Sequence, residues 1–527
     1  MMKIAVYDRY WGTAGGGEKF AAGIAAALAE DHDVTLLAHE PVDLKWLGER
    51  LQLDLGGITV EQVETDVAGA VAEATTPYDL FVNASFLSRD ANRARRGVYV
   101  VHFPGFRPSA VQRALGGMVT RLRRLGLSGG VQVGLGDGFY APEPQRLHTV
   151  HWSAGDAELV LQAPKAGRYS VTLLLGRYVP AAVTPIEAIV TLGDEVLGRA
   201  TITAPLGRVD RRRVVPLTFE VDLPAAGDTG RGVTVGLESA VWQPSSLGLG
   251  ADTRVLGVPL AGWYGGTGWR SLVGRAVPVL ASEQGNRFDA LDSYDRVLSN
   301  STYTQEWVKR MWRRGSDVLY PPVTSFLPYE KRPMILAVGR FFVPGTGHNK
   351  KQLEMVKAFR QLREQEAIDV SEWSLHLVGG CAPEHEAYFE RVRAAAEGLP
   401  VTLHRDATGA ELARLYGEAS IFWHAAGMGE NPKRHPERQE HFGITTVEAM
   451  SAGAVPVVID AAGQAEIVAE GVSGFRFTTT EELVTATVRL VEDPGLRRRM
   501  AEAAEARAQT FEWDAFVTNV KAKILGA

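Results

Sequence analysis

The hydrophobic pattern changes its period twice along the chain, and this change constrains the fold more than any other feature. The first and last parts alternate short apolar runs with segments long enough for a helix, which is typical of parallel sheets covered by helices. From about Val150 to Val258 the chain instead has short alternating segments separated by Gly, Pro and Asp turns. Because strands without intervening helices indicate an antiparallel sandwich, the sequence predicts a β-sandwich inserted into an α/β protein.

Two α/β regions flank this central part. The first has a strand at residues 2–8, a glycine-rich turn at residues 15–17 and a helical pattern over residues 18–30. The second begins at Pro333 with the apolar run MILAVG, which later runs such as LHLVGG and VPVVID follow. Each run precedes a helical pattern, so we expect a second parallel sheet. The predicted fold class is α/β, with two Rossmann-like domains and an all-β sandwich inserted in the N-terminal one.

The length of 527 residues also requires several domains, because single hydrophobic cores stop growing at roughly 250 to 300 residues. The proline pair in the sequence PPV marks the predicted linker between the two α/β domains. We place the N-terminal domain at residues 1–137 and 263–325, the sandwich at 138–262, the C-terminal domain at 326–510 and a last helix, which crosses back to the first domain, at 511–527.

Composition limits the classes of function. Hydrophobic residues make up 45% and charged residues 22% of the chain, as in ordinary soluble globular proteins. The formal net charge of -6 provides no general attraction to nucleic acid, so none is expected as a partner. Cys381 is the only cysteine, which excludes an intrachain disulfide. The start MMKIAVYDRYWG lacks the apolar core of a signal peptide, so we expect a cytoplasmic protein with at most peripheral membrane contact.

The segment EHFGITTVE at residues 440–448 carries the most informative polar pattern. Gly443 lets a ligand approach bare backbone, and a helix is expected to begin near Thr445. The free N–H groups and the dipole at a helix start favour an anion such as a diphosphate. Glu448 would reach back to a sugar hydroxyl, and Glu440 would lie on the entering loop. Alternatively, both glutamates are solvated acids near a helix start.

Two cations are expected at the same edge of the second sheet. A strand ends in Gly339-Arg340, and a helix begins near Lys350, beside Lys351. Cations aimed at the oxygens of a leaving diphosphate supply the electrostatic stabilisation that a metal ion provides elsewhere. No metal site is therefore predicted. The alternative is that Arg340 and Lys350 are ordinary surface charges.

These motifs resemble those of glycosyltransferase family 4. The resemblance covers residues 1–104 and 280–520, and its motifs are GGGE (15–18), HFP (102–104), LSNS (298–301), GR with the following Lys350, and EHFGITTVEAMSAGAVPVV from Glu440. The segment HFGI looks like that of dolichol-pathway α-1,2-mannosyltransferases and related bacterial enzymes. The resemblance implies the GT-B fold, in which two Rossmann-like domains face a cleft. It also implies a retaining reaction with a GDP- or UDP-linked sugar as donor, and no further cofactor.

The resemblance implies roles for single residues of the second domain. Arg340, which follows Gly339, and Lys350 would bind the donor diphosphate. Glu448 would bind the ribose hydroxyls, and Glu440 would hold the transferred sugar. The main chain of four residues would contact the β-phosphate and the sugar, namely Phe442, Gly443, Ile444 and Thr445.

The first domain would complete the implied site. His102 would face the sugar across the cleft, unless it is a structural histidine at a strand end. The glycine loop formed by Gly15, Gly16 and Gly17 would close over the diphosphate. Glu18 would lie near the acceptor. Lys351 stands where the family usually has glycine, which leaves open whether Lys350 or Lys351 reaches the phosphate.

The resulting hypothesis is an enzyme that moves a hexose, mannose or a similar sugar, to a hydroxyl of a glycan or lipid-linked acceptor. Such a reaction belongs to the synthesis of cell-surface polysaccharide or glycolipid. In the front-face reaction that the resemblance implies, the leaving diphosphate helps to deprotonate the acceptor, so Glu440 is not assigned as a nucleophile. The alternative is a non-catalytic sugar-binding scaffold protein that keeps the fold.

Two further segments each leave two interpretations open. Residues 107–125 are rich in arginine and interleaved with apolar residues. They form either a helix on the inner face of the plasma membrane or a solvated helix packed on the first domain. In the sandwich, three aromatic residues either stack on sugar rings, as in a carbohydrate-binding module, or belong to the core. These residues are Trp152, Tyr169 and Trp242.

Overall fold

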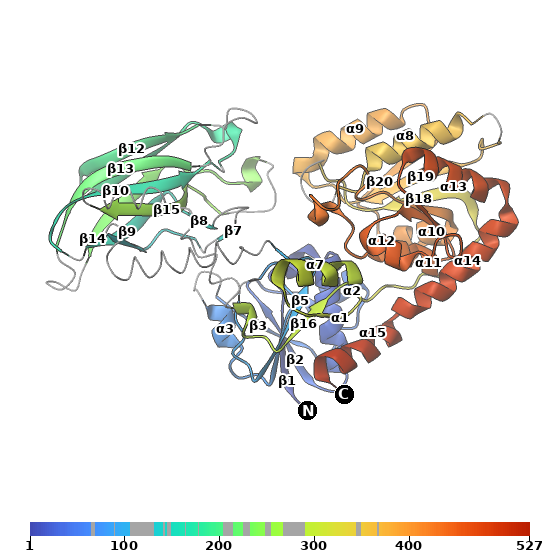
Figure 1. The fold of residues 1–527 in the computed structure, drawn as a ribbon, viewed down its shortest axis with the longest axis horizontal. Helices are drawn as coiled ribbons and strands as arrows, with labels where there is room; N and C mark the ends of the chain where they lie inside the picture. Colours follow the sequence, from blue (N-terminus) through green and yellow to red (C-terminus); the bar gives the residue numbers. More distant parts are fainter. Residues whose placement is uncertain are drawn as a thin grey trace. The chain divides into compact units, whose positions relative to one another are not determined.

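The structure is a computed structural model, and it divides the chain into two compact units. One unit consists of residues 1–63, 71–106 and 293–527, and the other of residues 64–70 and 107–292. The elements of both are labelled in Figure 1. The structure describes residues 1–64, 69–88, 90–105, 131–140, 143–144, 149–163, 165–177, 179–203, 214–224, 232–247, 254–266, 290–343, 349–365 and 368–526.

The larger unit begins with a parallel sheet whose strands pair in the same direction throughout. In sheet order the strands are β17 (Asp317–Val318), β16 (Arg296–Ser299), β5 (Arg96–Val101), β4 (Leu80–Asn83), β1 (Lys3–Tyr7), β2 (Asp33–Ala38) and β3 (Thr59–Gln62). β16 pairs directly with β5. The chain therefore leaves this sheet after β5 and returns to the neighbouring position nearly two hundred residues later.

Helices cover this first sheet, and the most buried of them is α1. Its alanine-rich sequence allows close approach to the strands, and ten of its residues are buried. α1 spans Gly16–Ala29, and further helices described in this part are α2 (Leu44–Leu51), α3 (Ala70–Ala74) and α7 (Thr302–Trp312). α1 is the first α-helix after β1, separated from it only by a short 3-10 turn, so its N-terminus lies at the carboxyl end of that strand.

A second parallel sheet forms the other half of this unit, and its central strands are buried on both faces. In sheet order its strands are β20 (Val401–Arg405), β19 (Ser374–Gly379), β18 (Arg332–Val338), β21 (Ala419–His424), β22 (Val455–Ile459) and β23 (Phe475–Phe477). Its helices are α8 (Gln352–Arg363), α9 (Glu386–Ala396), α10 (Gly409–Glu418), α11 (Ile444–Ser451), α12 (Ala462–Ile467), α13 (Thr480–Glu492) and α14 (Pro494–Ala508). The predicted α/β class with two Rossmann-like domains is confirmed.

The chain passes between these two α/β domains twice. The first passage contains Ser325, and the second contains Glu512, which precedes α15 (Trp513–Val520). The Ser325 hydroxyl donates a hydrogen bond of 3.0 Å to Glu512 Oε1, so the two passages lie side by side. α15 returns to the first domain and packs on α1, where Phe516 and Val520 join the hydrophobic core (Figure 1).

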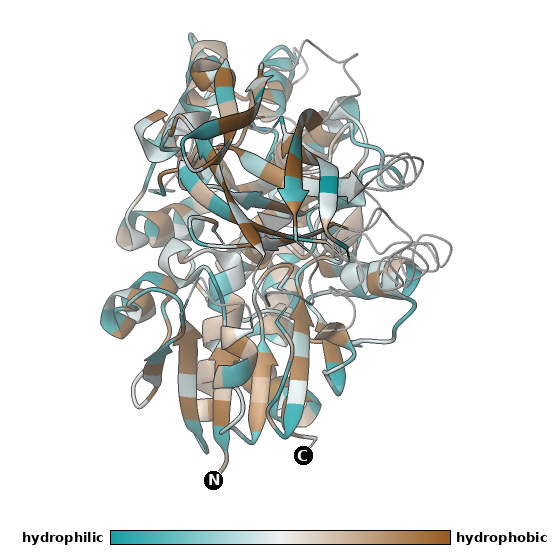
Figure 2. Cartoon of the chain, turned by 90° about the vertical axis from the view of Figure 1, so that its left-hand side faces the viewer, coloured by the Kyte–Doolittle hydropathy of each residue, from teal (hydrophilic) through white to brown (hydrophobic). Residues whose placement is uncertain are grey.

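The smaller unit contains two antiparallel sheets with a shared apolar core. Apolar and polar residues alternate along its strands, which appear as brown and teal bands in Figure 2. One sheet has the order β13 (Val214–Leu223), β10 (Gly167–Gly176), β15 (Pro259–Gly266), β8 (Thr149–Trp152) and β7 (Glu143–Pro144). The other has the order β12 (Glu195–Ile202), β11 (Ile186–Leu192), β14 (Val233–Ser239), β9 (Asp156–Gln162) and β6 (Gln132–Leu135).

Two bounds of this sandwich differ from those expected. β6 pairs with β9 and begins at Gln132, before the predicted start at residue 138. β15 continues to Gly266, beyond the predicted end at residue 262. One strand is short and the other contains several glycines, so the alternation of apolar and polar residues is too weak to predict either bound from the sequence.

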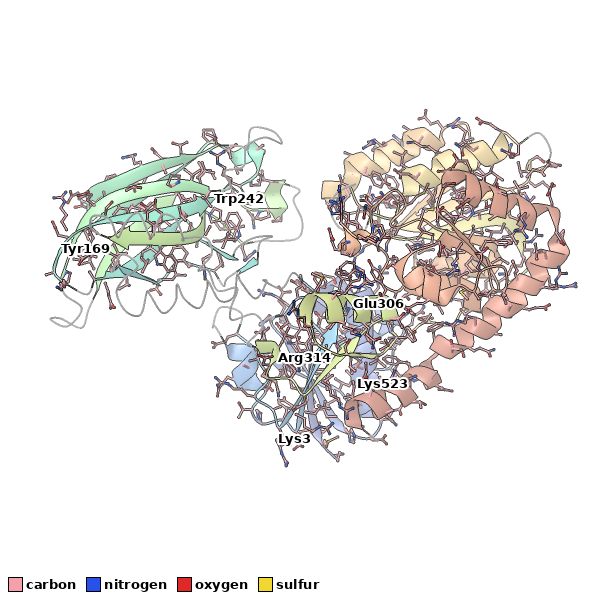
Figure 3. The ribbon with its side chains drawn as sticks, in the orientation of Figure 1. Lys3, Tyr169, Trp242, Glu306, Arg314 and Lys523 are labelled. Atoms are coloured by element: carbon pink, nitrogen blue, oxygen red, sulfur yellow. The ribbon has the colours of Figure 1, made fainter. Side chains whose placement is uncertain are left out.

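Two of the three aromatic residues proposed to bind sugar are core residues. Trp152 and Tyr169 are only 5% and 7% exposed, so the interpretation that they stack on a glycan is wrong. Trp242 packs on the same core and contacts Trp152 edge-on, with ring centroids 5.5 Å apart. Its indole N–H donates to the Gly257 carbonyl. Tyr169 and Trp242 lie at opposite ends of the sandwich (Figure 3), so they do not form one stacking surface.

The arginine-rich segment 107–125 lies outside the described residues, so the structure does not test its proposed membrane contact. In the part of the chain that the structure describes, no helix combines the length and the apolar character needed to span a membrane.

Candidate functional site

A cavity of about 510 Å³ lies at the carboxyl ends of strands from both parallel sheets. This is the edge at which open α/β sheets bind their ligands. Of the residues that the sequence predicts for the site, all but Glu18 and Lys351 line this cavity. The predicted residues that line it are Gly15, Gly16, Gly17, His102, Gly339, Arg340, Lys350, Glu440, Phe442, Gly443, Ile444, Thr445 and Glu448.

The N-terminus of α11 forms one wall of the cavity. The helix begins at Ile444, one residue before the expected start, and Gly443 is its N-cap. Gly443 has φ of 115°, and a Cβ atom at this position would lie 2.1 Å from Gln464 Nε2. Only glycine therefore fits both the backbone conformation and the space. The first N–H groups of α11 and its dipole make this wall suitable for an anion.

Glu440 is held by two side chains at the start of this wall. Lys350 Nζ forms an ion pair with Glu440 Oε2, and His424 Nε2 donates to the same oxygen at 3.1 Å. Burial raises the pKa of the Glu440 carboxyl, but Lys350 and His424 outweigh it and hold that pKa well below its usual range. Burial lowers the pKa of His424. Glu440 is thus a carboxylate that accepts hydrogen bonds.

Lys350 and Lys351 point to different acids. Lys351 Nζ is 2.9 Å from Glu430 Oε1 and does not line the cavity, whereas Lys350 does. A Cβ atom at Gly339 would lie 2.6 Å from Lys350 Cγ, so glycine makes room for the Lys350 side chain across the strand end. The geometry favours Lys350 as the lysine that reaches a ligand in the cavity.

Arg340 and the glycine loop approach each other from the two domains. The Arg340 guanidinium lies over the Phe342 ring, and its Nη2 is 3.6 Å from the Cβ position of Gly15. Gly15 N donates to Glu18 Oε2 at 2.6 Å, so the buried Glu18 side chain caps α1. The predicted role of Glu18 near an acceptor stays a prediction.

His102 follows β5, and its ring lies against Gly17 of the glycine loop. Its Nε2 donates to the Ala84 carbonyl at 2.6 Å, which fixes the tautomer. Burial lowers the pKa of His102, so the ring is neutral near pH 7 and Nδ1 is an acceptor. The Cβ position of Gly17 is 3.9 Å from Nδ1. The ring can therefore accept a hydrogen bond from a ligand hydroxyl.

Both oxygens of Glu448 already accept hydrogen bonds. Tyr416 donates to Oε2 at 2.9 Å, and Lys19 Nζ lies 3.2 Å from Oε1. Lys19, Tyr416 and His424 were not predicted from the sequence as site residues. A signal existed for His424, because it ends an apolar strand beside the strand that ends at Gly339. Tyr416 lies within a helical pattern and gave no such signal.

No cluster of three or more His, Cys, Asp or Glu side chains that could hold a metal ion occurs among the residues described.

Comparison with solved structures establishes the fold class. Over 100% of both chains, the protein is similar to Anabaena Alr3699/HepE in complex with UDP-glucose, with a TM-score of 0.51 and 14% identity. It is also similar to sucrose-phosphate synthase (tll1590) from Thermosynechococcus elongatus, with a TM-score of 0.50 and 14% identity over 98% and 97% of the two chains. The larger unit has the GT-B fold of glycosyltransferases.

Sequence comparison narrows this class for the C-terminal domain. Residues 324–507 match the family model described as Glycosyl transferases group 1, so this domain is a glycosyl transferases group 1 domain. It contains Arg340, Lys350, Glu440 and Glu448.

Curated relatives cover only part of the chain. The GDP-Man:Man(3)GlcNAc(2)-PP-Dol alpha-1,2-mannosyltransferase of Mus musculus is 26% identical over 182 residues, which are 32% of this chain and 35% of the relative. Alpha-1,3/1,6-mannosyltransferase ALG2 of Mus musculus is 24% identical over 42% of this chain and 56% of the relative. Sulfoquinovosyl transferase SQD2 of Arabidopsis thaliana is 25% identical over 36% of this chain and 33% of the relative. The chain thus spans about a third to a half of the length of these relatives.

Proposed function

We propose that the protein is a retaining glycosyltransferase of family 4 that transfers a hexose from a nucleotide-diphosphate sugar to a hydroxyl group. The observation that carries this proposal is the convergence of the α11 N-terminus, Arg340 and Lys350 on one cavity of a glycosyl transferases group 1 domain. Two cations and a helix start suit a diphosphate, because both kinds of group stabilise negative charge.

The charged residues divide between the diphosphate and the sugar. Arg340 and Lys350 bind the diphosphate, together with the backbone N–H groups of residues 442–445. Glu440 accepts a hydrogen bond from a hydroxyl of the transferred sugar through Oε1, since Lys350 and His424 both contact Oε2. When the donor binds, its phosphate shares the Lys350 ammonium with Glu440.

The first domain contributes a neutral contact to the sugar. His102 Nδ1 accepts a hydrogen bond from a sugar hydroxyl, because its Nε2 proton is committed to Ala84. The bond between the anomeric carbon and the diphosphate oxygen breaks while the acceptor oxygen bonds to the same face of that carbon. The acceptor proton passes to the leaving diphosphate, whose charge Arg340 and Lys350 stabilise. Glu440, tied to two donors, orients the sugar and is not a nucleophile.

The proposed donor is a GDP- or UDP-linked sugar, with mannose or a similar hexose. The relatives named as mannosyltransferases support mannose, and the neighbour solved with UDP-glucose supports UDP as an alternative base. The proposed acceptor is a glycan or a lipid-linked glycan in cell-surface polysaccharide or glycolipid synthesis. Its proposed place is the cytoplasmic face of the plasma membrane, which the arginine-rich sequence of residues 107–125 supports.

Donor hydrolysis and binding assays with a panel of UDP and GDP sugars test this function. We expect one nucleotide sugar to bind and to be hydrolysed slowly without acceptor, and Arg340→Ala to abolish most of that turnover. Binding without turnover, with or without added glycan acceptors, would instead indicate a sugar-binding scaffold protein. If no donor of the panel binds and none is hydrolysed, the proposal is refuted.

A further inference from the structure

Lys19, a cation of the first domain, contacts Glu448 on α11 of the second domain. Lys19 lies in the first turn of α1, yet its ammonium donates to Glu448 Oε1 at 3.2 Å. It also donates to Thr324 Oγ1 at 2.6 Å, on the segment that connects the two domains. The exposed fractions of the Lys19 and Glu448 side chains are 12% and 10%. A single ammonium therefore joins α1, the connecting segment and α11.

Glu448 is oriented from both sides. Tyr416, which is completely buried, donates to Oε2, while Lys19 contacts Oε1. A carboxylate has about four lone-pair positions, so these two donors leave two positions free. Glu448 and Lys19 both line the cavity of about 510 Å³, whereas Tyr416 does not. The free positions can accept hydrogen bonds from two neighbouring hydroxyl groups of a ligand.

We propose that Lys19 is a positioning residue of the nucleotide site: it fixes the Glu448 carboxylate so that it accepts both hydroxyls of a ribose cis-diol. The inference rests on the proposed function, because it assigns the nucleotide end of the same cavity. Without the ammonium, the Glu448 carboxylate would keep its hydrogen bond from Tyr416 but would lose the cation paired with it. Its orientation would then no longer be fixed from both sides. Affinity would then fall specifically for ligands that carry the diol.

A purely structural role for Lys19 makes a different prediction. If the ammonium only joins the two domains, its removal weakens every ligand of the cavity equally. Loss of a diol contact instead weakens a ribonucleotide more than its 2′-deoxy form, which has one hydroxyl fewer for Glu448. The difference between the two ligands therefore separates the two roles.

Isothermal titration calorimetry on the full chain measures this difference, with UDP and GDP and their 2′-deoxy forms as ligands. For the ribonucleotide that binds wild type, we expect Lys19→Gln to raise Kd about tenfold, because the charge-assisted contact that orients Glu448 is lost. The Kd of the 2′-deoxy form should rise by less than about threefold. In a Glu448→Gln background, Lys19→Gln should add almost nothing.

Lys521→Gln is the matched control, because Lys521 pairs with Glu30 and Asp31 and joins the C-terminal segment to the end of α1 away from the cavity. Its nucleotide Kd values should equal those of wild type, and melting curves should show that each variant is folded. Lys19→Arg, which keeps the charge, should preserve the preference for the ribonucleotide and provides a second variant.

Equal losses for the ribo and deoxy forms, or no loss in Lys19→Gln, would overturn the assignment of Lys19 while leaving the glycosyltransferase proposal intact. A wild-type protein that binds neither UDP nor GDP would overturn both.

Discussion

The wall of the cavity that comes from the second parallel sheet differs in chemistry from the wall that comes from the first. Among the described lining residues, the carboxylates Asp406, Glu440 and Glu448 all belong to the second domain. The first domain contributes the glycine loop, the neutral His102 and the cation Lys19 among others. Hydroxyl groups of a ligand therefore find their charged acceptors in the second domain.

This difference also appears in how each wall is held. Glu440 in the second wall is fixed by Lys350 and His424, residues of its own domain. The first wall gains its shape from backbone, since Gly15 and its neighbours allow a ligand to approach without side chains between. The comparison implies that substitutions in the second wall cost more binding energy than loss of the neutral His102 from the first, and the substitutions below test this.

The largest effect is expected for Gly443→Ala. The new methyl group would meet Gln464 Nε2, and alanine disfavours φ of 115°. Displacement of the α11 N-terminus should lower kcat/KM for the donor about a hundredfold. Gly471→Ala is the control, because Gly471 has φ of 69° in the same domain with nothing within 4 Å of its Cβ position. Similar losses in both variants would mean that backbone strain, and not the position of α11, is responsible.

Arg340→Ala should have the next largest effect. Loss of one charge-assisted contact to the diphosphate costs about 2 kcal/mol, or about thirtyfold in kcat/KM. Steady-state kinetics with the preferred donor measure it. Arg393→Ala removes an exposed arginine that pairs with Glu390 on α9 and should leave the kinetics unchanged. An active Arg340→Ala enzyme with wild-type kcat/KM would contradict the assignment of the second wall to the diphosphate.

Lys350→Met and Lys351→Met form a matched pair. Each removes a lysine that is paired with a carboxylate, but only Lys350 lines the cavity. We expect Lys350→Met to raise the donor KM about tenfold and Lys351→Met to leave it nearly unchanged. Equal KM changes would show that the two lysines do not differ in function.

The same pair has a pH signature. Because the folded-state pKa of Glu440 is depressed, its ion pair stabilises the protein above the ordinary pKa of 4.5, and this contribution is lost as the pH falls below that value. Urea unfolding should therefore show Lys350→Met to be less stable than wild type at pH 7. The difference should shrink below pH 4.5.

The smallest effect belongs to the first wall. His102→Phe removes one neutral hydrogen-bond acceptor, worth about 1 kcal/mol, so kcat/KM should fall about fivefold. The pKa of His102 is lowered by burial, so wild-type activity should not decline through loss of this acceptor until the pH is below 6.5. A larger loss in His102→Phe than in Arg340→Ala would reverse the comparison between the walls.

Much of the fold follows from local patterns in the sequence. The strand-then-helix alternation predicted both parallel sheets, because a buried parallel strand is a short apolar run whatever its partners are. The alternating segments predicted the strands of the sandwich, because a strand with one covered face alternates apolar and polar residues. For Trp152 and Tyr169, burial in the core and contact with a sugar both stayed open, since an alternating strand does not reveal which of its faces is covered; the structure shows that both are buried.

The candidate site was predictable where it depends on strand ends. Gly339, Arg340 and His102 follow apolar runs, and parallel sheets gather such positions at one edge. The partners of these groups were not predictable in the same way. Lys19 and Glu448 are 429 residues apart in sequence, so their ion pair depends on the arrangement of two domains. His424 was missed because its partner Glu440 follows a loop of fifteen residues with no clear pattern.

The two passages between the α/β domains have a mechanical consequence. Since Ser325 and Glu512 are hydrogen-bonded neighbours, a relative rotation of the domains would have to bend both connecting segments at this one place, and the axis of such a rotation would lie close to it. Atoms near a rotation axis move least. Lys19 touches Thr324, immediately beside Ser325. Opening of the cavity would therefore leave the Lys19–Glu448 end nearly fixed and widen the opposite end, so a ligand would remain anchored by one end while the other was exchanged.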